Sequence, residues 1–413
     1  MKKLFALAAV SAAVLGLASC GGDDKQKPDN PSTNGPKTIE LTYAGSKDKK
    51  DFNETLFEKF KADRKAKGDT NNYVIKFADI GPDKIDSTIT DWKTGPNVFE
   101  YASDKVQSLY EKGALAKVVG NNAKYLDDTM TKIGKDLATF NGSYYGYPWS
   151  GDNTYYLQYD KSVVTEKESK NIITLLDALH AKGKKLAYNL PEPFWSAGAL
   201  FTFGADYKVT FTEDGAISNI DADFDGEKGQ QAAKGILQIV KHPAWTKDDQ
   251  DPNLGAGIVG TWAINDFKTR FGENYAANVM PEITVDGETK NLGCFLGGKL
   301  FGVNPQNGDT DTKVAAHELA KFLSGDTCQE ARFDDSNVGP CAKNVSALDK
   351  VKNDYNMAVL VRQQEFAHAQ TAVPGAIWDA PKVLINGMID GTINGDTLVE
   401  ACKTLNESIK NSK

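Results

Sequence analysis

The sequence predicts an α/β fold, and three neighbouring stretches carry that prediction. Between residues 39 and 43 apolar and polar residues alternate, which is typical of a strand. Between residues 52 and 60 apolar residues recur at helical spacing, and between residues 73 and 77 they alternate again. Strand, helix and strand in succession indicate a largely parallel sheet covered by helices.

The same succession continues along the chain. A short helix around Ile85 and Ile89 precedes a strand at residues 97–101, and a second α/β series begins near Tyr155. We expect further strands at 185–188 and ending at 278–281, and helices at 106–110, 198–204, 230–240, 314–323, 346–355, 383–388 and 396–409. Asp51 is expected to cap the helix at residues 52–60, with Glu54 completing a capping box.

The N-terminus predicts export and a lipid anchor. Lys2 and Lys3 precede an apolar run, which is the pattern of a signal peptide. The segment Leu17-Ala18-Ser19-Cys20 resembles the lipobox of bacterial lipoproteins, in which the cysteine is lipidated and becomes the mature N-terminus. We therefore expect a signal peptide over residues 1–19 and lipidation of Cys20, which places the protein on the extracytoplasmic face of the cell membrane. The alternative is an ordinary signal peptide with a chance cysteine.

The composition of the remaining chain limits its organisation and partners. Residues 20–36 are polar and rich in Gly, Asp and Pro, so they are expected to form a disordered tether. Residues 37–413 are numerous enough for two domains. The formal net charge is −8, and no basic cluster is present, so nucleic acid is not expected as a partner.

The sequence gives little evidence of metal sites or disulfides. The four histidines lack a second His or Cys at ligand spacing, so no zinc site is expected. Asp221, Asp223 and Asp225 begin like a calcium loop, but Ala232 occupies the position that requires a glutamate. We interpret these residues as an acidic turn and expect neither a metal nor a cofactor. Residues 328 and 341 are both cysteines, which either pair around a loop or are small buried hydrophobes.

Several segments, taken in order, resemble the extracellular solute-binding proteins (family 1) of bacterial ABC importers, in particular the maltose/maltodextrin-binding type. The similar segments are residues 97–104, 109–115, 145–148, 159–161, 189–195, 257–262 and 373–391. The resemblance implies a two-lobed periplasmic-binding-protein fold (type II-like), with a ligand cleft between the lobes and multiple hinge crossings. It implies that residues 37–150 plus 296–338 form lobe one and that residues 151–295 plus 339–413 form lobe two. Crossings are expected near residues 150–153 and 292–295.

The same resemblance implies a set of ligand-binding residues. A sugar ring has an apolar face of C–H groups and polar edges, so aromatic side chains and carboxylates or amides together suit it. The expected aromatic residues are Tyr101, Phe194, Trp195, Trp262 and Trp378, and the expected polar residues are Asp104, Asp152 and Glu192.

Three of these positions keep an alternative. Phe194 and Trp195 cannot both face the ligand from an extended segment, and we favour Phe194. Asn153 is the alternative to Asp152, because the connection between residues 148 and 159 is one residue longer than the maltose-type pattern. Asp104 is alternatively the N-cap of the following helix.

The expected function is that of a monomeric, lipid-anchored substrate-binding component of an ABC sugar importer. It would bind an oligosaccharide of the maltose/maltodextrin kind and deliver it to the permease subunits without catalysis. The alternatives are an exported glycoside hydrolase and a receptor of the same fold for a non-sugar solute. The four arginines (Arg64, Arg270, Arg332 and Arg362) all lie outside the similar segments, which favours a sugar over an anionic ligand.

Overall fold

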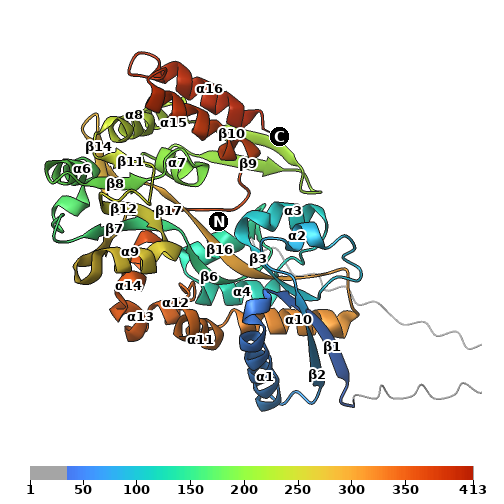
Figure 1. The fold of residues 1–413 in the computed structure, drawn as a ribbon. Helices are drawn as coiled ribbons and strands as arrows, with labels where there is room; N and C mark the ends of the chain where they lie inside the picture. The colour runs from blue at the N-terminus through green and yellow to red at the C-terminus, as the bar shows by residue number, and fades with distance from the viewer. Residues whose placement is uncertain (1–34, 413) are drawn as a thin grey trace, which may run out of the picture. The chain divides into compact units, whose positions relative to one another are not determined.

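Two mixed β-sheets organise the protein in the computed structural model, which describes residues 35–412 (Figure 1). The predicted signal peptide, Cys20 and the predicted tether up to residue 34 lie outside the described residues. Residues 37–413 form one unit of contacts. No helix between residues 35 and 412 is both long enough and apolar enough to cross a bilayer.

The first sheet has the strand order β17-β16-β3-β1-β2, and β6 also pairs with β16. Its strands are β1 (Thr38–Gly45), β2 (Asn72–Asp79), β3 (Val98–Ala102), β6 (Tyr147–Asn153), β16 (Cys294–Val303) and β17 (Ala367–Ala369). β1 runs parallel to β2 and β3, whereas β16 is antiparallel to β3 and β6.

The second sheet has the strand order β11-β8-β12-β7-β13. Its strands are β7 (Tyr155–Asp160), β8 (Lys185–Tyr188), β11 (Trp245–Thr246), β12 (Leu254–Gly260) and β13 (Tyr275–Asn278). β8 is parallel to β11 and β12, and β7 is antiparallel to β12 and β13. Three small antiparallel pairs complete the strands: β4 (Thr139–Phe140) with β5 (Ser143–Tyr144), β9 (Tyr207–Phe211) with β10 (Ile217–Ala222), and β14 (Glu282–Val285) with β15 (Glu288–Asn291).

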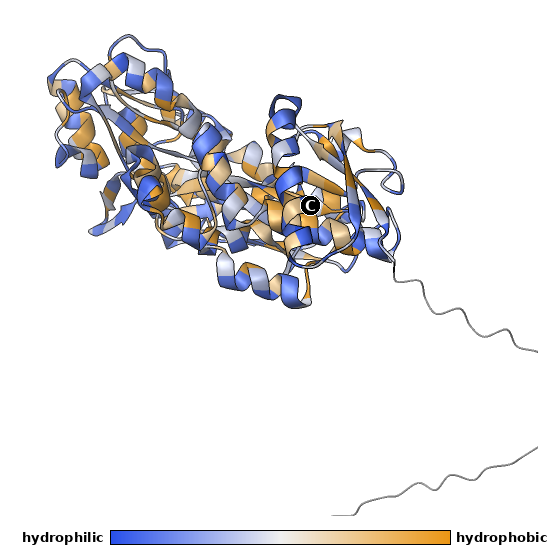
Figure 2. Ribbon diagram, turned by 90° about the horizontal axis from the view of Figure 1, so that it is seen from below, coloured by the Kyte–Doolittle hydropathy of each residue, from blue (hydrophilic) through white to orange (hydrophobic). Residues whose placement is uncertain are grey.

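Helices surround both sheets, and their apolar sides turn inward, as the orange segments of Figure 2 show. The longer ones are α1 (Lys50–Ala66), α4 (Gly120–Thr129), α6 (Ile172–Ala181), α7 (Pro193–Leu200), α8 (Glu227–Lys241), α9 (Ile264–Phe271), α10 (Thr310–Leu323), α11 (Asp326–Ser336), α14 (Tyr355–Gln363), α15 (Ala380–Asp390) and α16 (Leu398–Lys410). The shorter ones are α2 (Ile85–Thr88), α3 (Val106–Glu111), α5 (Lys132–Ala138), α12 (Lys343–Ser346) and α13 (Asp349–Asn353). In α1, Leu56, Phe57 and Phe60 are buried because helical spacing places them on one side.

Two large apolar cores accompany the two sheets, and the predicted crossings run between them. Tyr147 of β6 belongs to the first core and Leu157 of β7 to the second. β16 runs from Phe295 in the second core to Phe301 in the first. The helix α14, which the expected boundaries assign to lobe two, packs in the first core and also contacts β7 and β13. The predicted lobe boundaries therefore stay a prediction.

Several predicted helix ends are wrong. α1 begins at Lys50, directly after the 3₁₀ turn Lys47–Lys49, so Asp51 lies in its first turn and does not cap it. The predicted helix at 346–355 is not continuous: it covers the last residue of α12, the whole of α13 and the first residue of α14. α14 is a separate helix because Asp354 caps it by accepting a hydrogen bond from the Met357 N–H. The helix predicted to include 198–204 is α7, which begins at Pro193, where proline suits the first helical position, and ends at Leu200, before residue 204.

The cysteines and the acidic turn have structural roles. Cys328 and Cys341 are buried and free, so they form no disulfide and pack as small apolar residues. In the acidic turn, Asp225 accepts a hydrogen bond from Asn406. Between residues 35 and 412, no group of three or more His, Cys, Asp or Glu is arranged to hold a metal.

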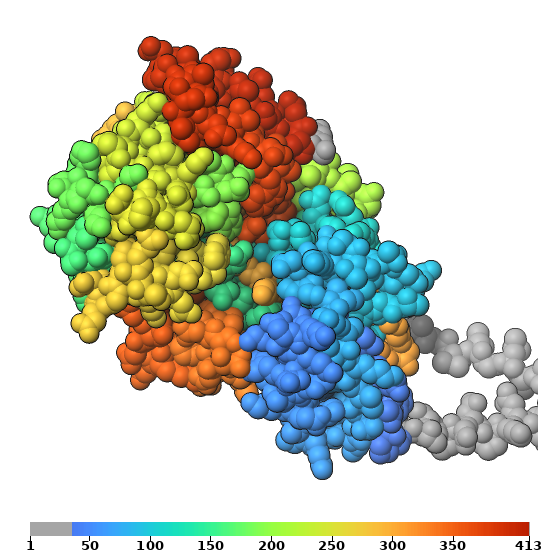
Figure 3. All heavy atoms as spheres, viewed as in Figure 1, coloured from blue at the N-terminus to red at the C-terminus, as the bar shows by residue number. Residues whose placement is uncertain are grey.

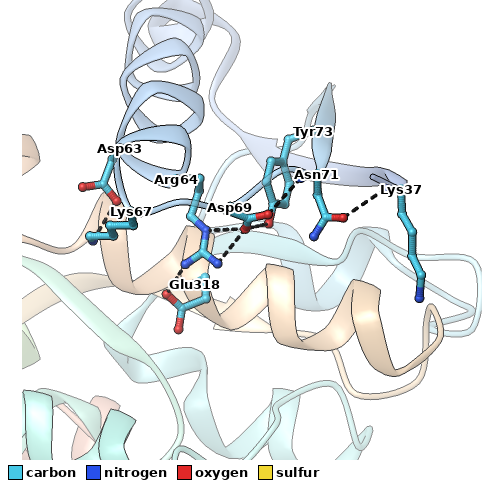
Figure 4. Close-up of polar contacts among 8 residues, drawn as sticks. All are labelled: Lys37, Asp63, Arg64, Lys67, Asp69, Asn71, Tyr73 and Glu318. Atoms are coloured by element: carbon cyan, nitrogen blue, oxygen red, sulfur yellow. Dashed lines mark hydrogen bonds and ion pairs between the residues drawn. The ribbon is translucent and has the colours of Figure 1, made fainter. Parts of the chain in front are cut away.

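A paired polar cluster, the Arg64 network (Arg64, Asp69, Asn71, Tyr73 and Glu318), fastens the end of α1 to β2 and α10 (Figure 4). Arg64 donates to Asp69 Oδ2 from Nε and Nη2, at 2.9 and 2.7 Å, and to Glu318 Oε2 from Nη1, at 2.9 Å. Burial alone would raise the pKa of Asp69, but the hydrogen bonds from Tyr73, the Asn71 N–H and Arg64 outweigh it and lower this pKa to about 2.

Candidate functional site

A cavity of about 560 Å³, the central cavity, lies where β6, β12 and β16 meet the first turn of α9. Figure 3 shows the face that carries it, between the yellow segment of α9 and the blue segments nearer the N-terminus. Its lining includes Asp83, Ser150, Asp152, Asn153, Trp262, Asn265, Lys268, Lys299, Ser336 and Asn337. Carboxylates, amides, hydroxyls and amines from separate segments therefore surround one indole ring.

Two hydrogen bonds fix the segment that carries this indole. β12 ends at Gly260, and the next residues form the 3₁₀ turn Thr261–Ala263. The Thr261 N–H donates to the Thr154 carbonyl at 3.1 Å, and Thr261 Oγ1 donates to the Asp152 carbonyl at 2.8 Å. A Cβ atom on Gly260 would collide with the Trp262 ring, so only glycine lets the ring lie against the backbone there.

Trp262 is 59% exposed and begins a row of aromatic rings. Its ring centroid is 6.3 Å from that of Phe194, which is 6.2 Å from Phe295 in a stacked arrangement. Phe295 in turn stacks on Trp378 at 5.8 Å. The structure thus links three predicted aromatic residues through Phe295, a residue that the sequence did not single out.

Phe194 and Trp195 both belong to this aromatic group. They lie on α7 rather than on an extended segment, so the expectation that they point in opposite directions is wrong. Consecutive helical residues are only about 100° apart, and both rings lie 6.3 Å from Trp262. Both are partly buried, and Trp195 Nε1 has no hydrogen-bond partner among the described residues.

Tyr101 is a correction, because the structure places it in the core and not in the cavity. It is 0% exposed, and its hydroxyl donates to the Tyr145 carbonyl at 3.2 Å. β3 lies between β1 and β16, so the Tyr101 side chain is covered by neighbouring elements and has no face free for a ligand. Its neighbour Ala102, the last residue of β3, lines the central cavity instead.

Asp104 and Glu192 do not line the central cavity. Asp104 lies in the 3₁₀ turn Ser103–Lys105, and its nearest charge is Lys105 at 3.4 Å. Lys105, not Asp104, occupies the N-cap position of α3, so the alternative cap role is wrong. Glu192 is exposed at the N-cap position of α7, where its side chain makes no capping hydrogen bond. Their ligand roles stay predictions.

Asp152 and Asn153 both line the cavity, but only the Asp152 side chain has a hydrogen-bond partner among the described residues. Asp152 Oδ2 accepts a hydrogen bond from the Gly339 N–H at 3.0 Å. Burial raises the pKa of Asp152, although this hydrogen bond and the nearby Lys299 oppose the rise. Asn153 is exposed, and its side chain has no hydrogen-bond partner between residues 35 and 412. Both residues are therefore placed to meet a ligand, and the ligand role of each stays a prediction.

Sequence reasoning missed several lining residues. Asn265 and Lys268 follow Trp262 on α9, so helical spacing after a predicted ligand residue was a usable signal. Lys299, Ser336 and Asn337 come from β16 and from the end of α11, and only the tertiary fold brings them to the cavity.

Comparisons with known proteins agree with this architecture. A family model described as bacterial extracellular solute-binding protein matches residues 55–359. The maltodextrin-binding protein MdxE of Bacillus subtilis (strain 168) is 24% identical to this chain, and the match covers 99% of this chain and 98% of that protein.

Two solved structures share the fold. The maltodextrin-binding protein MalE1 from L. casei BL23, solved without ligand, has a TM-score of 0.77 at 19% identity and covers 91% of this chain and 99% of its own. The maltose-binding periplasmic protein MalE from Listeria monocytogenes, in complex with maltose, has a TM-score of 0.72 at 19% identity. The match covers 90% of this chain and 97% of that chain. The predicted two-lobed periplasmic-binding fold is thereby confirmed.

Proposed function

This chain belongs to the bacterial extracellular solute-binding proteins, and we propose that it binds a maltodextrin-like oligosaccharide in the central cavity. As the substrate-binding component of an ABC importer, it would deliver this sugar to the permease subunits. The maltodextrin- and maltose-binding names of its relatives support the choice of ligand.

The observation that carries the proposal is the exposed Trp262 ring among unpaired polar side chains of one cavity. An indole can cover the apolar face of a sugar ring and exclude water from it. Asn153, Asn265 and Lys268 line the same cavity and can bond the hydroxyls at the edge of that ring. Phe194, the next ring in the row, is partly exposed, whereas Phe295 beyond it is buried and supports the row from the core.

The test is titration calorimetry of the purified protein with glucose, maltose and longer glucose oligomers. We expect saturable binding of at least one oligomer, and an increase in melting temperature with ligand concentration because the ligand stabilises only the folded state. A protein that binds no glucose oligomer contradicts the proposal.

The absence of catalysis is part of the proposal. Glycoside hydrolysis requires two carboxyl groups that flank the scissile bond. Asp152 is bonded to the Gly339 N–H, and Asp83 is the other carboxylate of the cavity. We expect chromatography to return a bound oligosaccharide intact after long incubation. Hydrolysis that is lost in Asp152→Asn would instead favour the exported glycoside hydrolase.

The membrane anchor is a separate part of the proposal and rests on the sequence near Cys20. A lipid on this cysteine would hold the protein on the extracytoplasmic face, near its permease. Cys20→Ala is expected to release the protein from the membrane fraction while its sugar affinity stays unchanged. Retention of the variant in the membrane fraction contradicts the anchor.

A further inference from the structure

Gly339 lies in the segment that follows α11, and both of its main-chain polar groups are bonded to the end of β6. Its carbonyl accepts a hydrogen bond from the Gly151 N–H at 3.0 Å, and its N–H donates to Asp152 Oδ2, also at 3.0 Å. A Cβ atom on Gly339 would lie 2.7 Å from the Asp152 Cβ, so glycine permits this close approach. The Asp152 carboxylate therefore serves as the acceptor that fixes the segment 336–339.

The segment 336–339 carries two of the residues that line the central cavity, Ser336 and Asn337. Asn337 ends α11 in a left-handed conformation, with a φ of 56°, and its side chain is exposed. An amide side chain can both donate a hydrogen bond to a hydroxyl and accept one from it. Because Asn337 lies only two residues before Gly339, its place in the cavity depends on the bond between Gly339 and Asp152.

The main chain of Asp152 holds a second segment of the same cavity. Its carbonyl accepts a hydrogen bond from Thr261 Oγ1 at 2.8 Å, and Thr261 directly precedes the exposed Trp262 ring. One residue at the end of β6 is thus bonded both to the turn that carries Trp262 and to the segment that carries Asn337.

The bond to Gly339 argues against a direct sugar contact from the Asp152 carboxylate. Gly339 is buried, and a buried N–H that loses its acceptor costs more free energy than one hydrogen bond to a sugar hydroxyl contributes. A carboxylate that turned from Gly339 toward a ligand would leave this N–H without an acceptor. Asn153 can turn toward a ligand without breaking a bond, because it is exposed and its side chain has no partner in the described part of the chain.

We propose that Asp152 is a positioning residue for sugar binding: it holds the segments of Trp262 and Asn337 in the central cavity and leaves the contact with the sugar to Asn153. This inference rests on the proposed function and deepens it, because it separates the residues that shape the binding site from those that touch the ligand. It replaces the predicted ligand contact of Asp152. Positioning requires a hydrogen-bond acceptor at residue 152, but it does not require a negative charge there.

The test compares Asp152→Asn and Asp152→Ala with the parent protein by calorimetry over glucose oligomers. Asparagine keeps an acceptor oxygen for the Gly339 N–H and removes the charge, whereas alanine removes the acceptor. Thr261→Val removes the hydroxyl that bonds the Asp152 carbonyl and keeps the branched shape. Asp309→Ala is the matched control, because Asp309 Oδ1 accepts a hydrogen bond from the Thr312 N–H at 2.8 Å and Asp309 lines no part of the central cavity.

We expect Asp152→Ala and Thr261→Val each to weaken binding about fivefold, as for the loss of one hydrogen bond, and Asp152→Asn to restore binding to within about twofold of the parent. Asp309→Ala should bind as the parent does, although its melting temperature falls. Melting temperatures show whether each variant folds. If Asp152→Ala does not fold, Asp152→Asn and Thr261→Val still decide the question.

Hydrogen exchange of the ligand-free proteins gives a second measurement. Asp152→Ala should speed the exchange of the Gly339 amide, because its acceptor is gone, and Asp152→Asn should keep this exchange slow.

Equal losses of affinity in Asp152→Asn and Asp152→Ala would overturn the inference and make the charge itself a ligand contact. Parental affinity or parental Gly339 exchange in Asp152→Ala would also overturn it. A parent protein that binds no oligomer is a different result, which overturns the proposed function and this inference with it.

Discussion

The central cavity and the hollow beside the Arg64 network are both lined by charged and aromatic side chains, but their polar groups are engaged differently. The hollow has a volume of about 260 Å³, and its lining includes Arg64, Lys67 and Glu318. There Arg64 is bonded to Asp69 and Glu318 (Figure 4). In the central cavity, Lys268 and Lys299 form no ion pair with any described residue.

The difference shows how a binding site can be distinguished from a structural network. Charged groups that already bond one another gain little from a ligand, because each new hydrogen bond replaces an existing one. Unpaired groups around an exposed aromatic ring gain new bonds and bury apolar surface when a ligand arrives. We therefore assign stability to the Arg64 network and recognition to the central cavity, and the following predictions test this assignment.

The largest expected effect is that of Trp262→Ala on sugar binding. A desolvated aromatic anchor contributes about 1–3 kcal/mol to binding, whereas a side chain that is 59% exposed contributes little to folding. Calorimetry should show the weaker affinity, and denaturant unfolding should stay cooperative. Phe366→Ala is the control, since Phe366 is 41% exposed and lies outside both hollows. Normal binding by Trp262→Ala, or loss of cooperative unfolding, would make Trp262 a structural residue.

The opposite pattern is expected for Arg64→Met. This variant leaves Glu318 without its partner and removes two hydrogen bonds to Asp69, while Arg64 is 23% exposed. We expect the free energy of unfolding to fall by about 1–2 kcal/mol and sugar affinity to stay constant. A variant with parental stability and weakened binding would reverse the assignment of the two regions.

Acid should weaken the Arg64 network. The pKa of Asp69 is about 2 in the folded protein, against an ordinary value of 3.8. Because the pKa of Asp69 is lowered in the folded state, its carboxylate adds to the free energy of unfolding. This stabilisation is fully present above about pH 4 and is lost as the pH falls toward about 2. With Asp69 10% exposed, this amounts to about 1–2 kcal/mol. Urea unfolding at a series of pH values checks it, and Asp69→Asn should remove this part of the pH dependence. An equal slope in both proteins would contradict the prediction.

The same two regions show what the sequence can predict. Alternation and helical spacing predicted β1, α1, β2 and β8 because local patterns reflect which side of an element is buried. The Gly257–Trp262 segment was found because it resembles a segment of the solute-binding family. The prediction for Tyr101 was wrong because neighbouring strands cover its side chain. The sequence around residue 101 does not show which strands pack beside it. Arg332 was set aside because it lies outside the similar segments, although α11 places it in the wall of a smaller pocket that shares Lys299 and Ser336 with the central cavity.

The smallest expected effects come from one lysine in each region. Lys67 is 62% exposed and pairs with Asp63 at 2.8 Å, so Lys67→Ala should change the free energy of unfolding by less than about 0.5 kcal/mol. Lys268 is exposed, lines the central cavity and has no ion-pair partner among the described residues, although its Nζ lies 5.8 Å from the centroid of the Tyr275 ring. A new hydrogen bond from it to a sugar hydroxyl is worth about 0.5–1 kcal/mol, so Lys268→Ala should weaken sugar binding about two- to fivefold and leave stability unchanged. Calorimetry and urea unfolding of both variants separate the two effects. Equal sugar affinity in Lys67→Ala and Lys268→Ala would show that an unpaired lysine at the cavity has no part in recognition, and the assignment would then rest on the aromatic row and the amides.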